Sequence, residues 1–159
     1  KAPMSINSSA GTKLYICATA NPTATDSSTY AALTWVEVNE VETIPEFGDA
    51  ASAITYTSLS DSRVRKLKGA YDAGSLSVTM AHDPSDAGQT DCATAALTPY
   101  SDAFKVVAAD AANASATDSV FYFQAKVMSF RLNPQGANNV TMRTLSLDID
   151  TAIVSVPSA

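Results

Sequence analysis

The chain has 159 residues, enough for one domain that buries roughly 70% of its unfolded surface in a single core. Its formal net charge of −6 argues against a protein that grips nucleic acid, because such proteins gain affinity by neutralising phosphates with Lys and Arg. One histidine, two cysteines without C-x-x-C spacing and no long apolar run leave little for a metal site or a membrane span. We therefore expect 1–159 to be a single domain that binds no cofactor or metal and contacts no membrane.

Short segments rich in Val, Ile, Thr, Tyr and Phe, bounded by Gly, Pro, Asn and Asp, predict a mainly β fold. Residues 1–10 are polar, lack the apolar core of a signal peptide, and are expected to form a flexible N-terminal arm. The small polar stretch 21–28 indicates a loop. Strands are predicted at 13–19, 34–42, 53–59, 75–82, 103–109, 119–132 and 140–154.

Residues 86–100 break the strand pattern and predict one short α-helix. Thr90 or Asp91 could cap its start, and Pro99 should end it, because proline removes a helix donor and clashes with the preceding turn. The apolar positions with helical spacing are Cys92, Ala93, Ala96, Leu97 and Tyr100.

The last two predicted strands change the phase of their apolar alternation. The first changes between Val127 and Met128 and the second near Thr144, and both breaks are equally far from Gly136. A hairpin turning at 133–139 would place the breaks opposite each other, as a shared bulge or bend requires. Residues 119–154 would then form a long bent hairpin that contributes to two sheets, which is typical of an orthogonal β-sandwich or a partly closed barrel.

Charges of opposite sign gather in two places. Acidic residues without a base occupy 37–49, and four of the chain's ten bases lie within 63–68, in a predicted loop over 58–69. These groups could satisfy each other within one subunit or across a boundary between stacked copies. The acids are Glu37, Glu40, Glu42, Glu46 and Asp49, and the bases are Arg63, Arg65, Lys66 and Lys68.

Motifs that would support catalysis are missing from the sequence, so we do not expect an enzyme. His82 lies at a predicted strand end, where a surface turn is a better interpretation than a general base. Asp148 and Asp150 lie on one face of a strand and could be a calcium pair or a solvated acidic face. The aromatic residues expected in the core or in subunit contacts are Trp35, Tyr56, Phe104, Phe121, Phe123 and Phe130.

Taken in order, these features resemble the major tail tube protein of long non-contractile bacteriophage tails and of gene transfer agents. The segments that carry the resemblance are GTKLYI at 11–16, VNEVETIPEFG at 38–48, TYTSLSD at 55–61 and KGAYDAGSLSVTM at 68–80, followed by the helix and the closing hairpin. The resemblance implies a β-sandwich subunit of hexameric rings that stack into a tube, whose lumen conducts DNA without sequence-specific binding. It places the chain in the tail tube of a virion assembled in the bacterial host cytoplasm.

The same resemblance implies partners and contacts. The partners would be further copies of the chain, a tape-measure protein, a tail terminator and a distal tail protein. The loop 58–69 would be a long inter-subunit loop whose bases contact acids of an adjacent copy, with Glu40, Glu42 and Glu46 as candidates. Candidate lumen-facing acids are Glu37, Asp148 and Asp150, because an acidic channel keeps DNA from adhering.

Two other interpretations stay open at this point. A ring-forming tube protein of type VI secretion would share the fold and the hexameric plan but would carry effectors in place of DNA. A pilin or adhesion-type β-sandwich would be a binding module that stays monomeric in solution.

Overall fold

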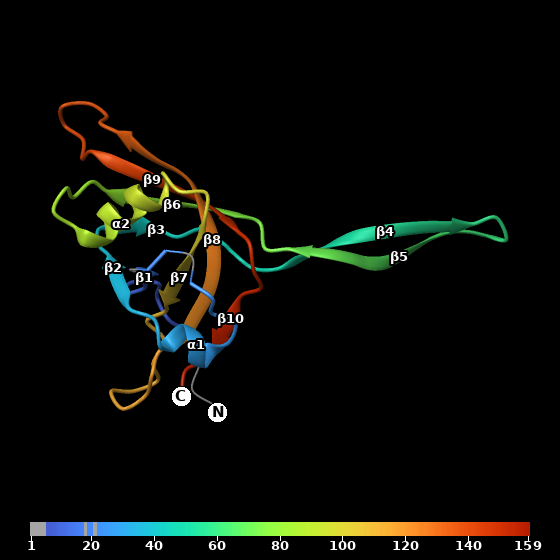
Figure 1. Ribbon diagram of the computed structural model, residues 1–159. Coiled ribbons are helices and arrows are strands. Elements are labelled where there is room, and N and C mark those ends of the chain that lie inside the picture. The colour runs from blue at the N-terminus through green and yellow to red at the C-terminus, as the bar shows by residue number, and fades with distance from the viewer. Residues whose placement is uncertain (1–5, 18, 21) are drawn as a thin grey trace.

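Ten strands and two short helices lie in residues 6–17, 19–20 and 22–159, the part of the chain that the computed structural model describes (Figure 1). The elements are β1 Lys13–Cys17, α1 Ser27–Ala31, β2 Trp35–Val38, β3 Val41–Thr43, β4 Ala50–Ser58, β5 Asp61–Asp72, β6 Ser75–Ala81, α2 Ala87–Ala95, β7 Ser101–Val107, β8 Val120–Asn133, β9 Met142–Ile149 and β10 Val154–Val156. Half of the flexible segment expected at 1–10, residues 1–5, lies outside the described residues.

Eight strands form one bent sheet in the order β2-β1-β7-β8-β9-β6-β3, and β10 pairs with the start of β8. The long strand β8 serves both halves, because its first part pairs with β7 and its second part with β9. The main core takes side chains from both halves, including Leu14 and Phe104 on one side and Val78 and Leu147 on the other. The fold is therefore mainly β and sandwich-like, as predicted.

The sheet is not closed into a barrel. Strands β2 and β3 stand at opposite ends of the strand order, although only Asn39 and Glu40 separate them in the chain. Glu40 has a positive φ of 59°, which turns the chain sharply from one half of the sheet to the other. Of the two predicted architectures, the sandwich is the one that forms.

The bend predicted in the long hairpin is present as a bulge in β8. Val127 pairs with Leu147 and Ser129 with Ser146, so Met128 has no opposite residue. One extra residue shifts the alternation by one, which returns Phe130 to the core side opposite Leu145. The matching break predicted near Thr144 is wrong, because the strand pairing is regular there and the bulge in β8 alone restores the inward phase.

The helix predicted at 86–100 is shorter than expected, and its cap lies elsewhere. Helix α2 ends at Ala95, before the turn that leads to Pro99. Asp86 is its N-cap, with a carboxylate oxygen that accepts from the Gln89 amide at 2.8 Å. The apolar stripe is only partly buried, since Cys92 is inaccessible but Leu97 is 88% exposed.

A second helix, α1, begins at Ser27, inside the polar stretch 21–28 that was predicted to be a loop, so that prediction is wrong at its end. Asp26 caps it through a capping box with Thr29. Its buried Tyr30 stacks on Tyr122 with ring centroids 5.2 Å apart. The helix thereby covers the outer face of β8 and builds a second, smaller core with Cys17 and Ala103.

The largest departure concerns residues 58–69, which were predicted to be a loop. Strands β4 and β5 pair antiparallel over most of their length and turn at Leu59 and Ser60. The resulting hairpin, residues 50–72, projects far from the rest of the chain (Figure 1). We call residues 50–72 the arm and the remaining described residues the body.

Candidate assembly surface on the arm

Almost every residue of the arm is exposed, in contrast to the strands of the body. Only Ser58, Asp61 and Gly69 reach an intermediate level of burial. An isolated two-stranded hairpin is marginally stable in water unless something covers it. In a single copy, the arm is therefore the part of the molecule with the fewest packing contacts to stabilise it.

The strand register divides the arm into two faces, because residues directly opposite each other in an antiparallel pair share a face. Ile54 lies opposite Leu67, and Tyr56 opposite Arg65. We call this set the apolar face. The other side has Ala53 opposite Lys68 and Thr55 opposite Lys66, and we call it the lysine face.

The four bases that the sequence groups together therefore do not act as one patch. Arg65 lies on the apolar face, whereas Lys66 and Lys68 lie on the lysine face. Arg63 lies at the register shift next to the turn, so it belongs to neither regular face. Arg65 is also held within the arm by Asp61, with 2.7 Å between the guanidinium and carboxylate. Sequence analysis missed this division because it treated the segment as a loop.

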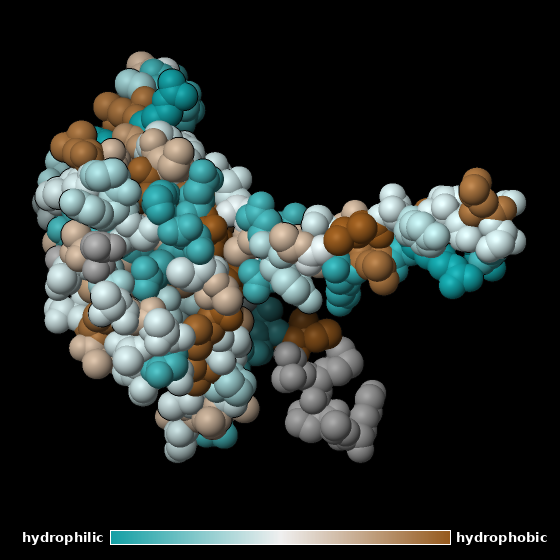
Figure 2. All heavy atoms as spheres, turned by 45° about the vertical axis from the view of Figure 1, so that its right-hand side comes forward, coloured by the Kyte–Doolittle hydropathy of each residue, from teal (hydrophilic) through white to brown (hydrophobic). Residues whose placement is uncertain are grey.

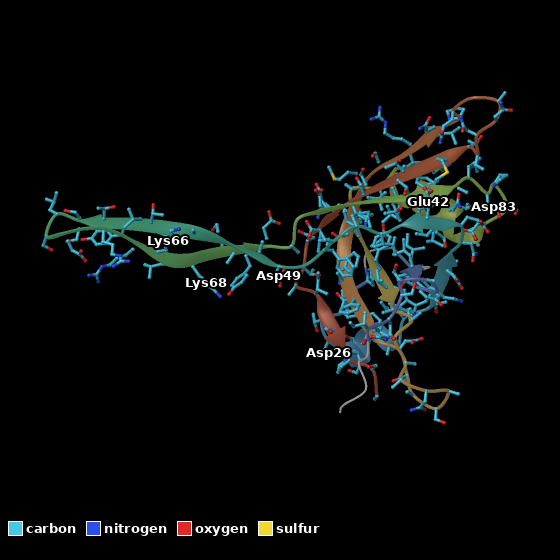
Figure 3. All side chains as sticks on the ribbon, turned by 180° about the vertical axis from the view of Figure 1, so that it is seen from behind. Asp26, Glu42, Asp49, Lys66, Lys68 and Asp83 are labelled. Carbon is cyan, nitrogen blue, oxygen red and sulfur yellow. The ribbon has the colours of Figure 1, made fainter. Side chains whose placement is uncertain are left out.

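The predicted acidic partners lie on the body and not beside the bases of the same copy. Figure 3 shows Lys66 and Lys68 on the arm and Glu42 on the body, well apart. Within the described residues, no ion pair joins the arm's bases to the acids of 37–49. Glu40, Glu42 and Glu46 are all exposed. Pairing within one subunit, which the sequence left open, does not occur in this structure.

Two of the three candidate lumen acids already have a basic partner. Glu37 lies 3.2 Å from the Lys13 ammonium, and a hydrogen bond between the two raises the pKa of Lys13. Asp150 accepts from Lys126 at 2.8 Å and from the Ser101 hydroxyl at 3.0 Å, which lowers the pKa of its carboxyl. Asp148 is exposed and lies opposite Lys126 in the strand register.

The charge of the molecule is divided between arm and body. The arm holds four bases and two acids, a net charge of +2, which leaves six bases and fourteen acids, a net charge of −8, for the rest of the chain. Such a molecule presents complementary surfaces to further copies of itself.

Exposed apolar side chains on the arm are a signal that charge counting overlooked. Figure 2 shows hydrophobic atoms gathered part-way along the arm and again near its tip. Ile54 is 53% exposed, Leu67 65% and Tyr56 60%, and Leu59 at the turn is fully exposed. Tyr56 was expected in the core or in a subunit contact, and only the second alternative is compatible with this position.

Glycines fix the root of the arm. A Cβ at Gly69 would lie 2.6 Å from the Ser52 hydroxyl, so a larger residue there would require the Ser52 side chain to move. Gly74, which follows β5, has a positive φ of 76°. The chain then enters β6, whose neighbours in the sheet are β3 and β9.

The other candidate groups take structural positions. His82 accepts a hydrogen bond at Nδ1 from the Arg143 side chain at 3.0 Å, and that guanidinium lies over the Phe130 ring. Cys17 and Cys92 are free and buried, and burial raises the pKa of both thiols. No helix in the described part of the chain is long and apolar enough to cross a membrane.

The sequence model of the phage tail tube protein family matches residues 18–155, which is most of the chain. The chain belongs to the phage tail tube protein family. No curated protein sequence matches it significantly. The family match confirms the resemblance drawn from the sequence and places the chain in the tail tube of a virion.

Several solved structures share the fold of this chain. The SPP1 tail tube subunit is 16% identical, with a TM-score of 0.64 over 92% of this chain and 76% of that one. The sheath/tube terminator of the extracellular contractile injection system PVC is 10% identical, with a TM-score of 0.64 over 91% and 92%. A chain of the PVC sheath-tube complex is 8% identical, with the same TM-score over 92% and 88%. The shared feature is the fold.

Family membership decides between the interpretations that the sequence left open. A type VI secretion tube and an adhesion-type sandwich were both compatible with the β content, but the matching family is that of phage tail tubes. It is a family of structural proteins.

Proposed function

We propose that this tail tube protein forms rings of six copies that stack into a tube conducting DNA, and that the arm joins neighbouring copies. The observation that carries the proposal is the arm itself, an exposed basic hairpin whose bases form no ion pair with the described residues of the body of their own subunit. In a family whose members form tubes, such a projection can contact a neighbouring copy.

The bases of the arm would meet acids on the body of another copy, with Glu40, Glu42 and Glu46 as the candidates. Their exposure and the opposite net charges of arm and body support this pairing. Its energy should depend on ionic strength, since exposed charges are screened over about 8–10 Å at physiological salt.

The remaining body charge would favour passage of DNA through the tube, because a net negative surface repels phosphates. Glu37, Asp148 and Asp150 are the proposed lumen acids. The proposed partners at the tube ends and inside it are a tail terminator, a distal tail protein and a tape-measure protein. A tube terminator among the structures of similar fold supports the first of these. The role would be purely structural, without catalysis, and 1–159 would act as one domain.

Negative-stain electron microscopy of the purified protein tests the proposal directly. We expect rings or hollow tubes at moderate salt, and fewer of them at high salt. Reversal of two bases, Arg63→Glu with Arg65→Glu, should block tube growth and leave the fold intact, as judged by circular dichroism.

Arg131→Glu is the control, because Arg131 is an exposed base on the body. It should assemble normally. Normal tubes from the arm double variant would contradict the role given to its bases, whereas monomers of the unaltered protein at every salt and concentration would contradict the tube itself.

A further inference from the structure

We infer that the arm docks onto a second copy through its apolar face, and that Lys66 and Lys68 remain outside this contact. The inference rests on the proposed function and makes it more specific. It replaces a contact made by four bases together with one centred on Ile54, Tyr56 and Leu67.

The composition of the two faces indicates which of them enters the contact. Side chains at the centre of protein interfaces are enriched in aromatic residues and arginine, whereas lysine is depleted there. The apolar face has Tyr56 beside Arg65, and Ile54 beside Leu67. The lysine face has Ala53 and Thr55 opposite lysines and Thr57 opposite Val64. Between residues 53 and 57 of β4 it therefore carries one large apolar side chain, against three on the apolar face.

The ion pair of Arg65 lowers the cost of burying this residue in a contact. Its guanidinium is already paired with Asp61 at 2.7 Å, so it enters an interface with its charge partly balanced. Guanidinium groups are weakly hydrated and stack on flat groups, whereas an ammonium is strongly hydrated. The Tyr56–Arg65 pair is therefore less costly to remove from water than Lys66 or Lys68.

The identity of the partner follows from placement and charge. The arm projects away from its own body, so the body of the same copy does not cover its exposed apolar residues (Figures 1 and 2). The arm is positive and the rest of the chain strongly negative, so the body of a second copy attracts the arm at long range even though Lys66 and Lys68 stay outside the contact. A hairpin of this length is marginal alone and gains stability when one face is covered.

Two matched double variants test the choice of face. Ile54→Ser with Leu67→Ser removes a cross-strand pair from the apolar face, and Lys66→Ser with Lys68→Ser shortens two side chains of the opposite face. The readout is the critical concentration for tube formation, measured by sedimentation and electron microscopy. We expect at least a tenfold increase for the first variant and less than a threefold change for the second.

A labelling experiment gives an independent readout that does not need an assembly defect. Tyr56→Cys and Lys66→Cys are each diluted into unaltered protein before assembly, so that the tubes form normally. The native cysteines Cys17 and Cys92 are buried, so a maleimide reports mainly on the new thiol. We expect the thiol at position 56 to react at least tenfold more slowly in tubes than in monomers, and the thiol at 66 to react equally in both.

The outcomes separate the inference from the function on which it rests. Tubes that form normally without Ile54 and Leu67, or that require the two lysines more strongly, overturn the assigned face and leave the tube intact. Equal labelling of position 56 in tubes and monomers has the same meaning. An unaltered protein that never assembles overturns both.

Discussion

The body and the arm are built from the same kind of strand, yet opposite principles hold them in place. In the body, strands alternate inward apolar and outward polar residues around a core that excludes water from Phe104, Phe123 and Leu147. In the arm, both faces are exposed to solvent, and only the backbone hydrogen bonds between β4 and β5 hold the two strands together. The body therefore carries its own stability, and the arm depends on what it meets.

An exposed apolar residue has different meanings in the two regions. Leu97 on the body is a single side chain at the end of a helix, and isolated cases of this kind are normal on protein surfaces. Ile54, Tyr56 and Leu67 lie together on one face of a projecting ribbon. Contiguous apolar residues of that kind mark an interaction site.

The largest expected difference comes from truncating one aromatic residue in each region. Phe104 is fully buried and stacks on Phe123 with centroids 5.9 Å apart. Phe104→Ala should lower the free energy of unfolding by about 3–5 kcal/mol, because it leaves a cavity in the core. Tyr56→Ala should change the stability of the monomer by about 0.5 kcal/mol or less. Denaturant unfolding of both variants measures this, and a comparable loss for both would mean that the arm belongs to the folded core.

A smaller effect is expected where α2 crosses β2. A Cβ at Gly88 would collide with the Glu37 carbonyl oxygen and lie 2.7 Å from the Val38 Cα, and backbone atoms cannot easily give way. Gly88→Ala should destabilise the body by about 1–3 kcal/mol. Gly136→Ala, in an open turn, is the control and should be nearly neutral. Thermal unfolding compares the two, and equal melting temperatures would show that the helix moves away freely.

The smallest expected effect concerns pH and one exposed ion pair of the body. The hydrogen bond from Lys126 lowers the pKa of Asp150, so the stabilisation is present above the unfolded pKa of about 4 and is lost as the pH falls through the lower folded pKa. Asp150→Asn should remove roughly 0.5 kcal/mol or less, because both side chains are about half exposed. Urea titrations at pH 7 and below pH 4 measure it, and a difference that persists unchanged at high salt would argue against an electrostatic cause.

Apolar alternation made much of the body predictable. The bulge at Met128 could be located from sequence because a change of phase over a long strand has few other causes. Helix α1 could not be found in this way, since five residues are too few to show a helical period. Asp86 was missed as the cap of α2 because the helix begins before its apolar stripe does.

The candidate site was predicted in composition but not in geometry. The basic run was identified as an assembly element, but Arg, Lys, Ser and Asp in succession look like a loop, and nothing local reveals that Lys66 faces away from Arg65. That division depends on the pairing of β5 with β4, which brings Tyr56 opposite Arg65. When two strands pack against no core, no buried face fixes their register, so the sequence specifies that register only weakly.

The attachment of the arm gives it a mechanical role in the body. Strand β5 continues into β6 through Ala73 and Gly74 alone, and β6 is bonded to β9 by an unbroken ladder from Ser75 to Ala81. A pull on the arm is therefore transmitted to β6, which lies between β3 and β9, and is shared along that ladder, so it does not act on a flexible tether. Tension between linked copies would be borne by an unbroken hydrogen-bonded ladder in each one.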